Sequence, residues 1–328
     1  MAAAALLAFT AGMIARAQSK PAAIQISGSS TVFPITGEAI RGFKETRAGK
    51  EVRFDLKETG TSAGFRDFCA GKVPISNASR PISSKELKAC DAKGIKFIEL
   101  PIAFDAVTVV VNPRNSWART ISTEQLSLLW NRKAQGVVNR WNQVNSAWPA
   151  SPIKLCGPGE DSGTFDYFTE VVNGKAKVSR SDYTSSEDDN TLVQGVSQDE
   201  FGFGYVPFAY YEHNTDKLRD VALKTPKGQL LLPTTKSIAE GSYTPFSRPI
   251  FIYVSSKALE KPEVSSFVSY YLKNVTKLSA QVNYVALPAA LNKLVYTSFE
   301  KKQTGSLYPK GEEIGLNLEM LLKKNTRQ

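Results

Sequence analysis

Glycine, serine and threonine gather in three short clusters, each between an apolar run and an amphipathic one. The clusters are Gly28-Ser29-Ser30-Thr31-Val32, Gly60-Thr61-Ser62-Ala63-Gly64 and Gly157-Pro158-Gly159-Glu160-Asp161-Ser162-Gly163-Thr164. The start of a helix leaves backbone N–H groups unpaired and carries about half a positive charge, and hydroxyl groups add further donors. Such a loop suits an oxyanion. Any single cluster is better explained by helix capping, but three at strand ends favour a ligand.

An arginine that can supply the countercharge stands near the second cluster, in Ser76-Asn77-Ala78-Ser79-Arg80-Pro81. The proline holds Arg80 in extended backbone, and a guanidinium is a natural bidentate partner for a tetrahedral oxyanion. Taken alone, Arg80 is more simply a solvated arginine; we assign it to the anion because the loops need a positive charge. The acidic run Ser185-Ser186-Glu187-Asp188-Asp189-Asn190 is most simply the cap of a helix over 191–196.

Other chemistry finds little support. A phosphate-binding P-loop needs Gly and Lys where Ser162 and Gly163 stand, and an esterase nucleophile at Ser162 needs Gly where Glu160 and Thr164 stand. His213 is the only histidine, and the spacing of the three cysteines matches no metal site. The sequence therefore disfavours hydrolysis and metal chemistry.

Short apolar strand candidates alternate with amphipathic helix candidates, which is typical of an α/β protein with largely parallel sheets. We expect strands over 23–27, 52–56, 97–100, 106–111 and 153–156, and helices over 33–45, 65–69, 83–89, 123–130 and 191–196. The near-continuous β-branched run at 106–111 predicts a strand buried on both faces.

Two apolar segments look like crossings between lobes: Asp105 to Asn112, and Arg248 to Ser255. They bracket a middle segment, so the sequence predicts two α/β lobes with a ligand cleft between them. We assign residues 18–111 and 247–328 to one lobe and 112–246 to the other. The four tryptophans, which all fall within 117–148, are interpreted as core packing of the second lobe.

The chain has 328 residues, 42% hydrophobic and 22% charged, as expected of a soluble globular protein of about two domains. Its net charge of +10 and pI of 9.3 indicate an anionic partner. Because the basic residues are spread along the chain and no nucleic-acid-binding motif accompanies them, nucleic acid is disfavoured.

The uncharged apolar run from Ala2 to Ile14 is followed by Ala15-Arg16-Ala17, which suits cleavage before Gln18. We interpret residues 1–17 as a signal peptide, too short to span a membrane, although it lacks a basic start. Cys69 and Cys90 each close an apparent helix, and export allows a disulfide between them; three free thiols are the alternative. Cys156 is interpreted as a buried residue at a strand end.

At these residues the sequence resembles the periplasmic phosphate-binding proteins of ABC transporters, of the PstS/SphX type. The resemblance runs from Ile24 to about Tyr296, and the later motifs look most like the cyanobacterial SphX branch. It is carried by Gly28-Ser29-Ser30-Thr31-Val32-Phe33-Pro34, Gly60-Thr61-Ser62-Ala63-Gly64-Phe65, Asn77-Ala78-Ser79-Arg80-Pro81-Ile82, Asp161-Ser162-Gly163-Thr164-Phe165 and Ser186-Glu187-Asp188-Asp189-Asn190.

The resemblance implies a type II periplasmic-binding-protein fold that closes on one inorganic phosphate and delivers it to a membrane permease, with no catalysis and no cofactor. We expect a periplasmic monomer without a lipid anchor. By family motif, phosphate would contact Thr31, the N–H of Val32, Thr61, Ser162, Gly163 and Thr164, with Ser30 adjacent. Arg80 joins this set as the countercharge assigned above.

Two positions depart from the best-known family pattern, which has aspartate where Arg80 stands and arginine where Pro158 stands. A buried carboxylate accepts a hydrogen bond from protonated phosphate and repels sulfate. We therefore expect another acid to replace the missing one, with Asp161 as first candidate and Asp189 as second. A receptor for sulfate or molybdate and a phosphate-sensing or surface protein without a transport role are the alternative functions.

Overall fold

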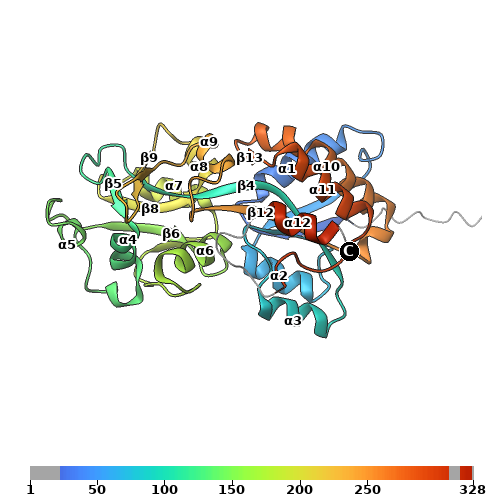
Figure 1. The fold of residues 1–328 in the computed structure, drawn as a ribbon, viewed down its shortest axis with the longest axis horizontal. Helices are drawn as coiled ribbons and strands as arrows, with labels where there is room; N and C mark the ends of the chain where they lie inside the picture. The colour runs from blue at the N-terminus through green and yellow to red at the C-terminus, as the bar shows by residue number, and fades with distance from the viewer. Residues whose placement is uncertain (1–22, 310–317, 327–328) are drawn as a thin grey trace, which may run out of the picture.

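A computed structural model describes residues 23–309 and 318–326. The predicted signal peptide, residues 1–17, lies outside the described residues. Buried apolar side chains form two main clusters, one mostly from residues 24–103 and 250–322, the other mostly from 106–246. Figure 1 shows the two corresponding halves side by side, and we call them lobe 1 and lobe 2 with the limits proposed above. No helix in the described ranges has the length and apolarity needed to cross a bilayer.

Lobe 1 begins with three strand and helix pairs in succession. They are β1 (Ile24–Gly28), α1 (Phe33–Lys44), β2 (Phe54–Glu58), α2 (Thr61–Cys69), β3 (Ile75–Ala78) and α3 (Ser84–Ala92). β1 pairs in parallel with both β2 and β3, and Gly28 lies opposite Glu58 on one side and Asn77 on the other. Because parallel strands point the same way, the loops that follow these three strands begin side by side.

Two long strands connect the lobes, β4 (Phe97–Val111) and β12 (Ser247–Ser255). They pair antiparallel, from Ser247 opposite Ala106 to Ser255 opposite Phe97. The sequence predicted two strands in place of β4, separated around Pro101, whereas the structure has one strand of 15 residues. The pairing shifts by one residue between Ile250 and Phe251, next to the proline, and such a bulge lets a strand continue through a residue without an N–H group.

Lobe 2 is built on β6 and β8, which are parallel to each other, with β8 antiparallel to β4. Its elements are β5 (Thr120–Ser122), α4 (Thr123–Trp130), η1 (Arg132–Ala134), α5 (Trp141–Val144), β6 (Lys154–Pro158), α6 (Gly163–Asn173), β7 (Thr184–Ser186), α7 (Asp189–Ser197), β8 (Gly202–Pro207), α8 (Phe208–Glu212), β9 (Arg219–Asp220), β10 (Ala222–Lys224), β11 (Leu230–Leu231) and α9 (Thr235–Ala239). The main sheet has the order β2-β1-β3-β12-β4-β8-β6-β7 and so passes through both lobes.

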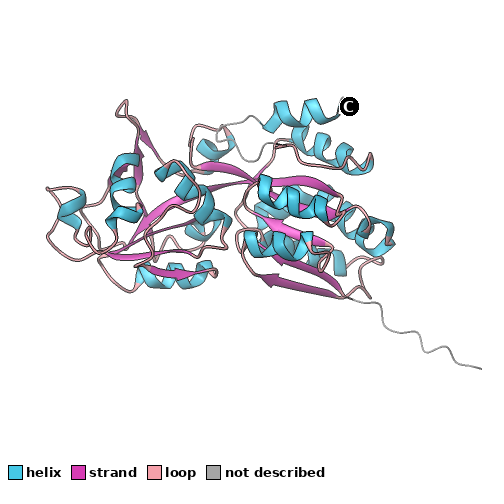
Figure 2. Cartoon of the chain, turned by 90° about the horizontal axis from the view of Figure 1, so that it is seen from below, coloured by secondary structure: helices cyan, strands magenta, loops and turns pink. Residues whose placement is uncertain are grey.

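After β12 the chain returns to lobe 1. The remaining elements are η2 (Ala258–Glu260), α10 (Pro262–Gln281), β13 (Val285–Ala286), α11 (Ala289–Glu300) and α12 (Leu318–Thr326). Figure 2 shows helices on both sides of the strands, which buries the strands as parallel sheets require. The predicted α/β architecture is therefore present in both halves of the molecule.

The aromatic and sulfur-containing side chains lie largely where the sequence placed them. Trp130, Trp141 and Trp148 belong to the core of lobe 2 and Trp117 packs against it, which confirms their interpretation as core residues. Cys69 and Cys90 form a disulfide that joins the end of α2 to α3. Cys156 is a buried thiol within β6, and burial raises its pKa to about 11.

Candidate functional site

The first two glycine clusters meet at the carboxyl edge of the lobe 1 sheet. At the end of β1, Gly28 has a φ of 134°, and a Cβ there would lie 2.1 Å from the carbonyl oxygen of Asn77. A Cβ on Gly64 would lie 2.6 Å from the Cα of Gly28. These glycines therefore let the loop after β1, the start of α2 and the end of β3 touch one another.

The third cluster comes from lobe 2 and closes onto the first two. The hydroxyl oxygens of Thr31 and Thr164 are 3.2 Å apart, and the N–H of Ser62 donates to the carbonyl of Asp161 over 2.9 Å. At the start of α6, a Cβ on Gly163 would lie 2.5 Å from Ser79 Oγ, across the boundary between the lobes. The structure thus describes a closed arrangement, in which a side chain at position 163 would force Ser79 and Thr61 of the other lobe to shift.

Buried hydroxyl groups surround this meeting point. Thr61 Oγ1 lies 3.2 Å from Ser79 Oγ and accepts a hydrogen bond from the Ser79 N–H. Ser162 caps α6, with its Oγ accepting from the N–H groups of Thr164 and Phe165. Because Ser162 Oγ accepts from the helix, its own proton stays available to an anion. These side chains are at most 5% exposed, so donors of both lobes converge away from water.

The charge at this point comes from Arg248 of β12, which the sequence indicated only as the start of a crossing between the lobes. Arg248 is 1% exposed, and its guanidinium donates to Thr164 Oγ1 over 2.6 Å and to the Gly163 carbonyl over 2.8 Å. It also forms a buried ion pair with Asp105 of β4, at 3.1 Å. The sequence does carry a signal for this role, because Arg248 is a charged residue near the start of an otherwise apolar crossing strand.

Two buried carboxyl groups accompany Arg248. Burial raises the pKa of Asp105, while Arg248 opposes that rise. Asp189, at the start of α7, is 2% exposed, and the Ser30 side chain partly offsets the effect of burial on its pKa. Burial raises the pKa of Asp189 to about 8, with the negative charges of Asp105 and Glu58 adding to the rise. Its Oδ2 has no hydrogen-bond partner among the described residues, which is unusual for a buried carboxyl oxygen.

Arg80 is buried near the same loops, but its donors are directed elsewhere. Its Nε donates to Asp166, its two terminal nitrogens both bond the carboxylate of Glu86, and the remaining bonds go to the Pro81 carbonyl and Ser62 Oγ. A guanidinium has five N–H groups, so all are used. The structure therefore does not support the predicted direct contact between Arg80 and an anion, because nearby carboxylates take its donors first.

Two further predicted residues also lie differently from expectation. Asp161, the first candidate for the missing acid, forms a bidentate ion pair with Arg66 at 2.7 and 2.9 Å, and its side chain is 37% exposed. This pairing lowers the pKa of Asp161. The N–H of Val32 donates to the Ser29 carbonyl over 3.2 Å. Asp161 is thus turned to the rim, whereas Asp189, the second candidate, lies among the buried groups.

Comparison with known proteins places this arrangement in a family. Residues 15–275 match the model of the PBP superfamily domain. The chain is 43% identical over 302 residues to protein SphX of Synechocystis sp., covering 92% of this chain and 89% of the relative. It is 38% identical over 262 residues to the phosphate-binding protein PstS of Staphylococcus saprophyticus, covering 80% and 79%.

Solved structures agree with the fold. A possible phosphate binding protein from Planctomyces limnophilus is 39% identical, with a TM-score of 0.64, covering 86% of this chain and 99% of that one. A putative phosphate ABC transporter substrate-binding protein with bound phosphate, from Clostridium perfringens, has a TM-score of 0.68 over 81% of this chain and all of its own, at 23% identity. The predicted periplasmic-binding-protein fold of two α/β lobes is therefore confirmed.

Proposed function

Because the chain belongs to the PBP superfamily, we propose that it is a receptor that binds one inorganic phosphate between its lobes and delivers it to an ABC permease. Its relatives named above include phosphate-binding and substrate-binding proteins, and no enzyme is among them. Binding and release, without chemical conversion and without a cofactor, is accordingly the activity that we assign to the chain.

One observation carries this proposal: donors from both lobes and from the hinge strand meet at a single buried point. Thr31 is the contribution of lobe 1, Thr164 that of lobe 2, and Arg248 joins them from β12. The starts of α2 and α6 face the same region, each with the partial positive charge of a helix N-terminus. A tetrahedral oxyanion matches such a set of convergent hydroxyl, N–H and guanidinium donors.

Ligand binding and lobe closure are then one process. Donors of lobe 1 and lobe 2 can contact the same anion only when the lobes are closed, so the anion favours the closed form over the open one. β4 and β12 carry the hinge, and Arg248 and Asp105 lie on them opposite each other. The charge that attracts the anion thus belongs to the element about which the lobes rotate.

Within this site we assign Asp189 the role of the acid that the family's best-known pattern places at position 80. Its buried, unpartnered Oδ2 and the influence of Ser30 on its pKa support the assignment. When ionised, this carboxylate accepts a hydrogen bond from the protonated oxygen of bound phosphate and repels fully ionised sulfate. Asp161 is less suited, because Arg66 holds both of its oxygens at the rim.

The departures at Arg80 and Pro158 favour a second candidate function, a receptor for another oxyanion such as sulfate or molybdate. Hydroxyl and N–H donors alone do not separate these anions, so selectivity depends on a carboxylate in the site. A sensing role without transport shares the same site and differs only in the partner. We further propose that the mature chain, from Gln18, is an exported periplasmic monomer that docks onto permease subunits.

Calorimetric titration of the mature chain with phosphate, sulfate and molybdate, from about pH 6 to about pH 9 at fixed salt, tests the function. Tight one-to-one binding of phosphate with weak or silent sulfate supports the phosphate receptor. Equal binding of the anions, or binding of sulfate or molybdate alone, would replace it with the second candidate. Phosphate uptake by cells that lack the gene, with and without a functional permease, separates transport from sensing.

A further inference from the structure

Beside the anion loops, a second set of charged residues joins the lobes without facing the hydroxyl cluster. Arg80 lies in lobe 1 between β3 and α3, and Asp166 lies in the first turn of α6 in lobe 2. Nε of Arg80 donates to Asp166 Oδ2 over 2.8 Å, and the two side chains are only 7% and 5% exposed. This is a buried ion pair whose partners belong to opposite lobes.

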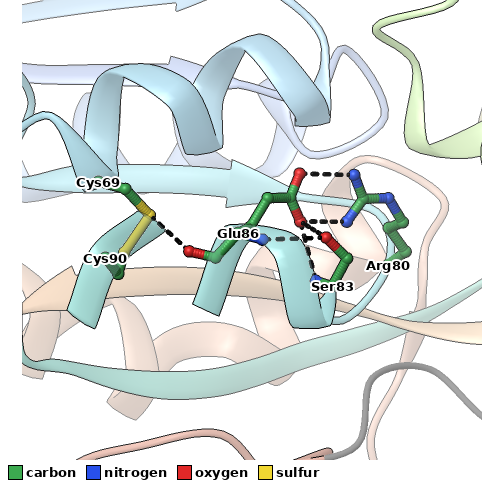
Figure 3. The surroundings of a disulfide bond; sticks show 5 residues. All are labelled: Cys69, Arg80, Ser83, Glu86 and Cys90. Carbon is green, nitrogen blue, oxygen red and sulfur yellow. Dashed lines mark hydrogen bonds and ion pairs between the residues drawn. A yellow bond between two sulfur atoms is a disulfide. The ribbon is translucent and has the colours of Figure 1, made fainter. Parts of the chain in front are cut away.

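Glu86 of α3 holds Arg80 in place from the lobe 1 side. Its two carboxylate oxygens bond the terminal guanidinium nitrogens of Arg80 at 2.8 and 2.9 Å, as Figure 3 shows. Ser83 in turn fixes Glu86, through a capping box in which the Ser83 N–H and hydroxyl both donate to Glu86 Oε2. All these groups belong to lobe 1, so this part of the arrangement does not require a closed cleft.

The disulfide joins the two helices that carry these groups. Cys69 ends α2 and Cys90 lies in α3, and the Cys69 sulfur is 3.5 Å from the carbonyl oxygen of Glu86. Glu86 is therefore attached to a helix whose position against α2 is covalently fixed. Because α2 also carries Ser62, which accepts a bond from Arg80, one rigid unit orients the guanidinium from two sides.

We propose that Arg80, Glu86 and Asp166 form an interlobe latch that sets the balance between the open and closed forms without touching the anion. Glu86 keeps the guanidinium of Arg80 oriented in the open form, and Asp166 reaches it only on closure. For the affinity effect, the proposal rests on the phosphate-binding function proposed above. A guanidinium that Glu86 already holds loses little conformational entropy when Asp166 contacts it. The free energy of the ion pair is therefore available almost entirely to stabilise the closed form.

A groove of about 620 Å³ runs over the latch and fits this role. It is lined by Arg66, Arg80 and Glu86 from lobe 1 and by Asp166 and Lys177 from lobe 2, so it is formed only when the lobes meet. Lys177 adds a second contact to Asp166, at 3.3 Å. The carboxylate of Asp166 is thus balanced by positive charge from both lobes in the closed form.

The chain offers a matched control in a second interlobe ion pair. Arg66 and Asp161 also join the lobes with two bonds, but their side chains are 63% and 37% exposed. An exposed ion pair contributes little because water screens the charges, whereas breaking a buried pair leaves a charge without a partner. Loss of the Arg66 pair should therefore change closure far less than loss of the latch.

The test uses the mature chain with nitroxide labels on cysteines at the exposed Lys88 of α3 and Lys133 of η1, and compares Asp166→Asn, Glu86→Gln and Arg66→Ala. Without ligand, distances from double electron–electron resonance should shift toward the open form in Asp166→Asn and Glu86→Gln. Phosphate should bind these two variants at least about tenfold more weakly, mainly through faster dissociation. Arg66→Ala should bind within about fivefold of the unchanged chain.

Direct contact between Arg80 and the anion predicts the opposite sign, because neutralising Asp166 would free the guanidinium and tighten phosphate binding. Tighter binding by Asp166→Asn, or unchanged distances and affinity in both latch variants, would overturn the proposal. Thermal unfolding identifies any variant that fails to fold. If Asp166→Asn fails to fold, Glu86→Gln, which keeps the shape of the side chain, tests the latch instead. Failure of the unchanged chain to bind phosphate would count against the proposed function, while the distances without ligand would still decide on the latch.

Discussion

The hydroxyl oxygens of Thr31 and Thr164 lie 3.2 Å apart, although the two residues belong to opposite lobes and are 133 positions apart in the chain. Thr164 Oγ1 also accepts a hydrogen bond from Arg248 of the hinge strand. One threonine oxygen therefore lies where both lobes and the hinge meet.

Arg248→Lys should lower phosphate affinity by about 2 kcal/mol or more, as expected when a buried charged contact is weakened. Lysine keeps the charge but cannot contact Asp105, Thr164 and the Gly163 carbonyl with one planar group. Calorimetry measures the change. The matched control is Arg180→Lys, a buried arginine in lobe 2 whose ion-pair partner is Asp182. Equal losses of phosphate affinity in the two variants would mean that Arg248 only stabilises the fold and does not contribute to the anion site.

Asp189→Asn should narrow the preference for phosphate over sulfate. Because the pKa of Asp189 is raised to about 8, the carboxyl keeps its proton below that pH and can donate to either anion. Above it the carboxylate accepts a hydrogen bond from the O–H that phosphate still carries and repels sulfate. The preference should therefore increase as pH rises through about 8 in the unchanged chain and stay flat in Asp189→Asn. Asp161→Asn is the comparison, and a larger effect there would return the role to Asp161.

Gly163→Ala should weaken phosphate binding while leaving the folding of each lobe nearly unchanged. The added Cβ would lie 2.5 Å from Ser79 Oγ and 2.7 Å from Thr61 Oγ1, and both of these atoms belong to the other lobe. The clash exists only when the cleft is closed. Gly37→Ala in α1, where Leu56 at 4.0 Å is the nearest neighbour, is the control and should bind normally. Normal binding by Gly163→Ala would argue against the closed arrangement as the bound form.

Replacing Cys69 and Cys90 together by serine should lower the free energy of unfolding by about 2–4 kcal/mol, since the disulfide restricts the unfolded chain. The two cysteines are 21 residues apart. Urea denaturation gives the difference, and Cys156→Ala separates it from the effect of losing a buried thiol. Thiol titration of the denatured, unreduced protein should find one free thiol, that of Cys156. A count of three would exclude the disulfide.

Glu99 should make the stability of lobe 1 depend on pH. Burial raises its pKa to about 7, against bonds from Ser306, Tyr253 and the Leu307 N–H that lower it. Between the usual pKa of 4.5 and about 7, the folded protein keeps a proton that the unfolded chain has released. The free energy of unfolding should therefore fall as pH rises through this window.

The Glu99→Gln variant isolates this contribution. The stability of the unchanged chain relative to Glu99→Gln should drop by on the order of 1–3 kcal/mol between about pH 5 and pH 8. The exposed Glu260→Gln serves as the control for loss of a carboxylate. Urea denaturation across the pH range provides the measurement, and parallel curves for the unchanged chain and Glu99→Gln would contradict the prediction.

Local patterns predicted most of the elements and their order. The helix over 123–130 was predicted at its observed limits, and the helix over 33–45 differs from α1 by one residue. The helix expected at Phe65 instead begins at Thr61, so Thr61 lies within the first turn of α2. The two strands predicted around Pro101 are one, because the pairing of β4 with β12 carries the strand through the proline. Strand pairing is non-local and overrides such local signals.

The sequence by itself determined the three glycine clusters, the hydroxyl groups at the starts of α2 and α6 and the family to which the chain belongs, because helix capping and hydrophobic periodicity depend on neighbouring residues. Only the tertiary structure decided which charges accompany them. Arg80 pairs with Asp166, 86 positions away, and Arg248 pairs with Asp105, 143 positions away. Burial and the nearest countercharge decide whether an arginine or an aspartate serves the site, and both depend on the packing of distant segments.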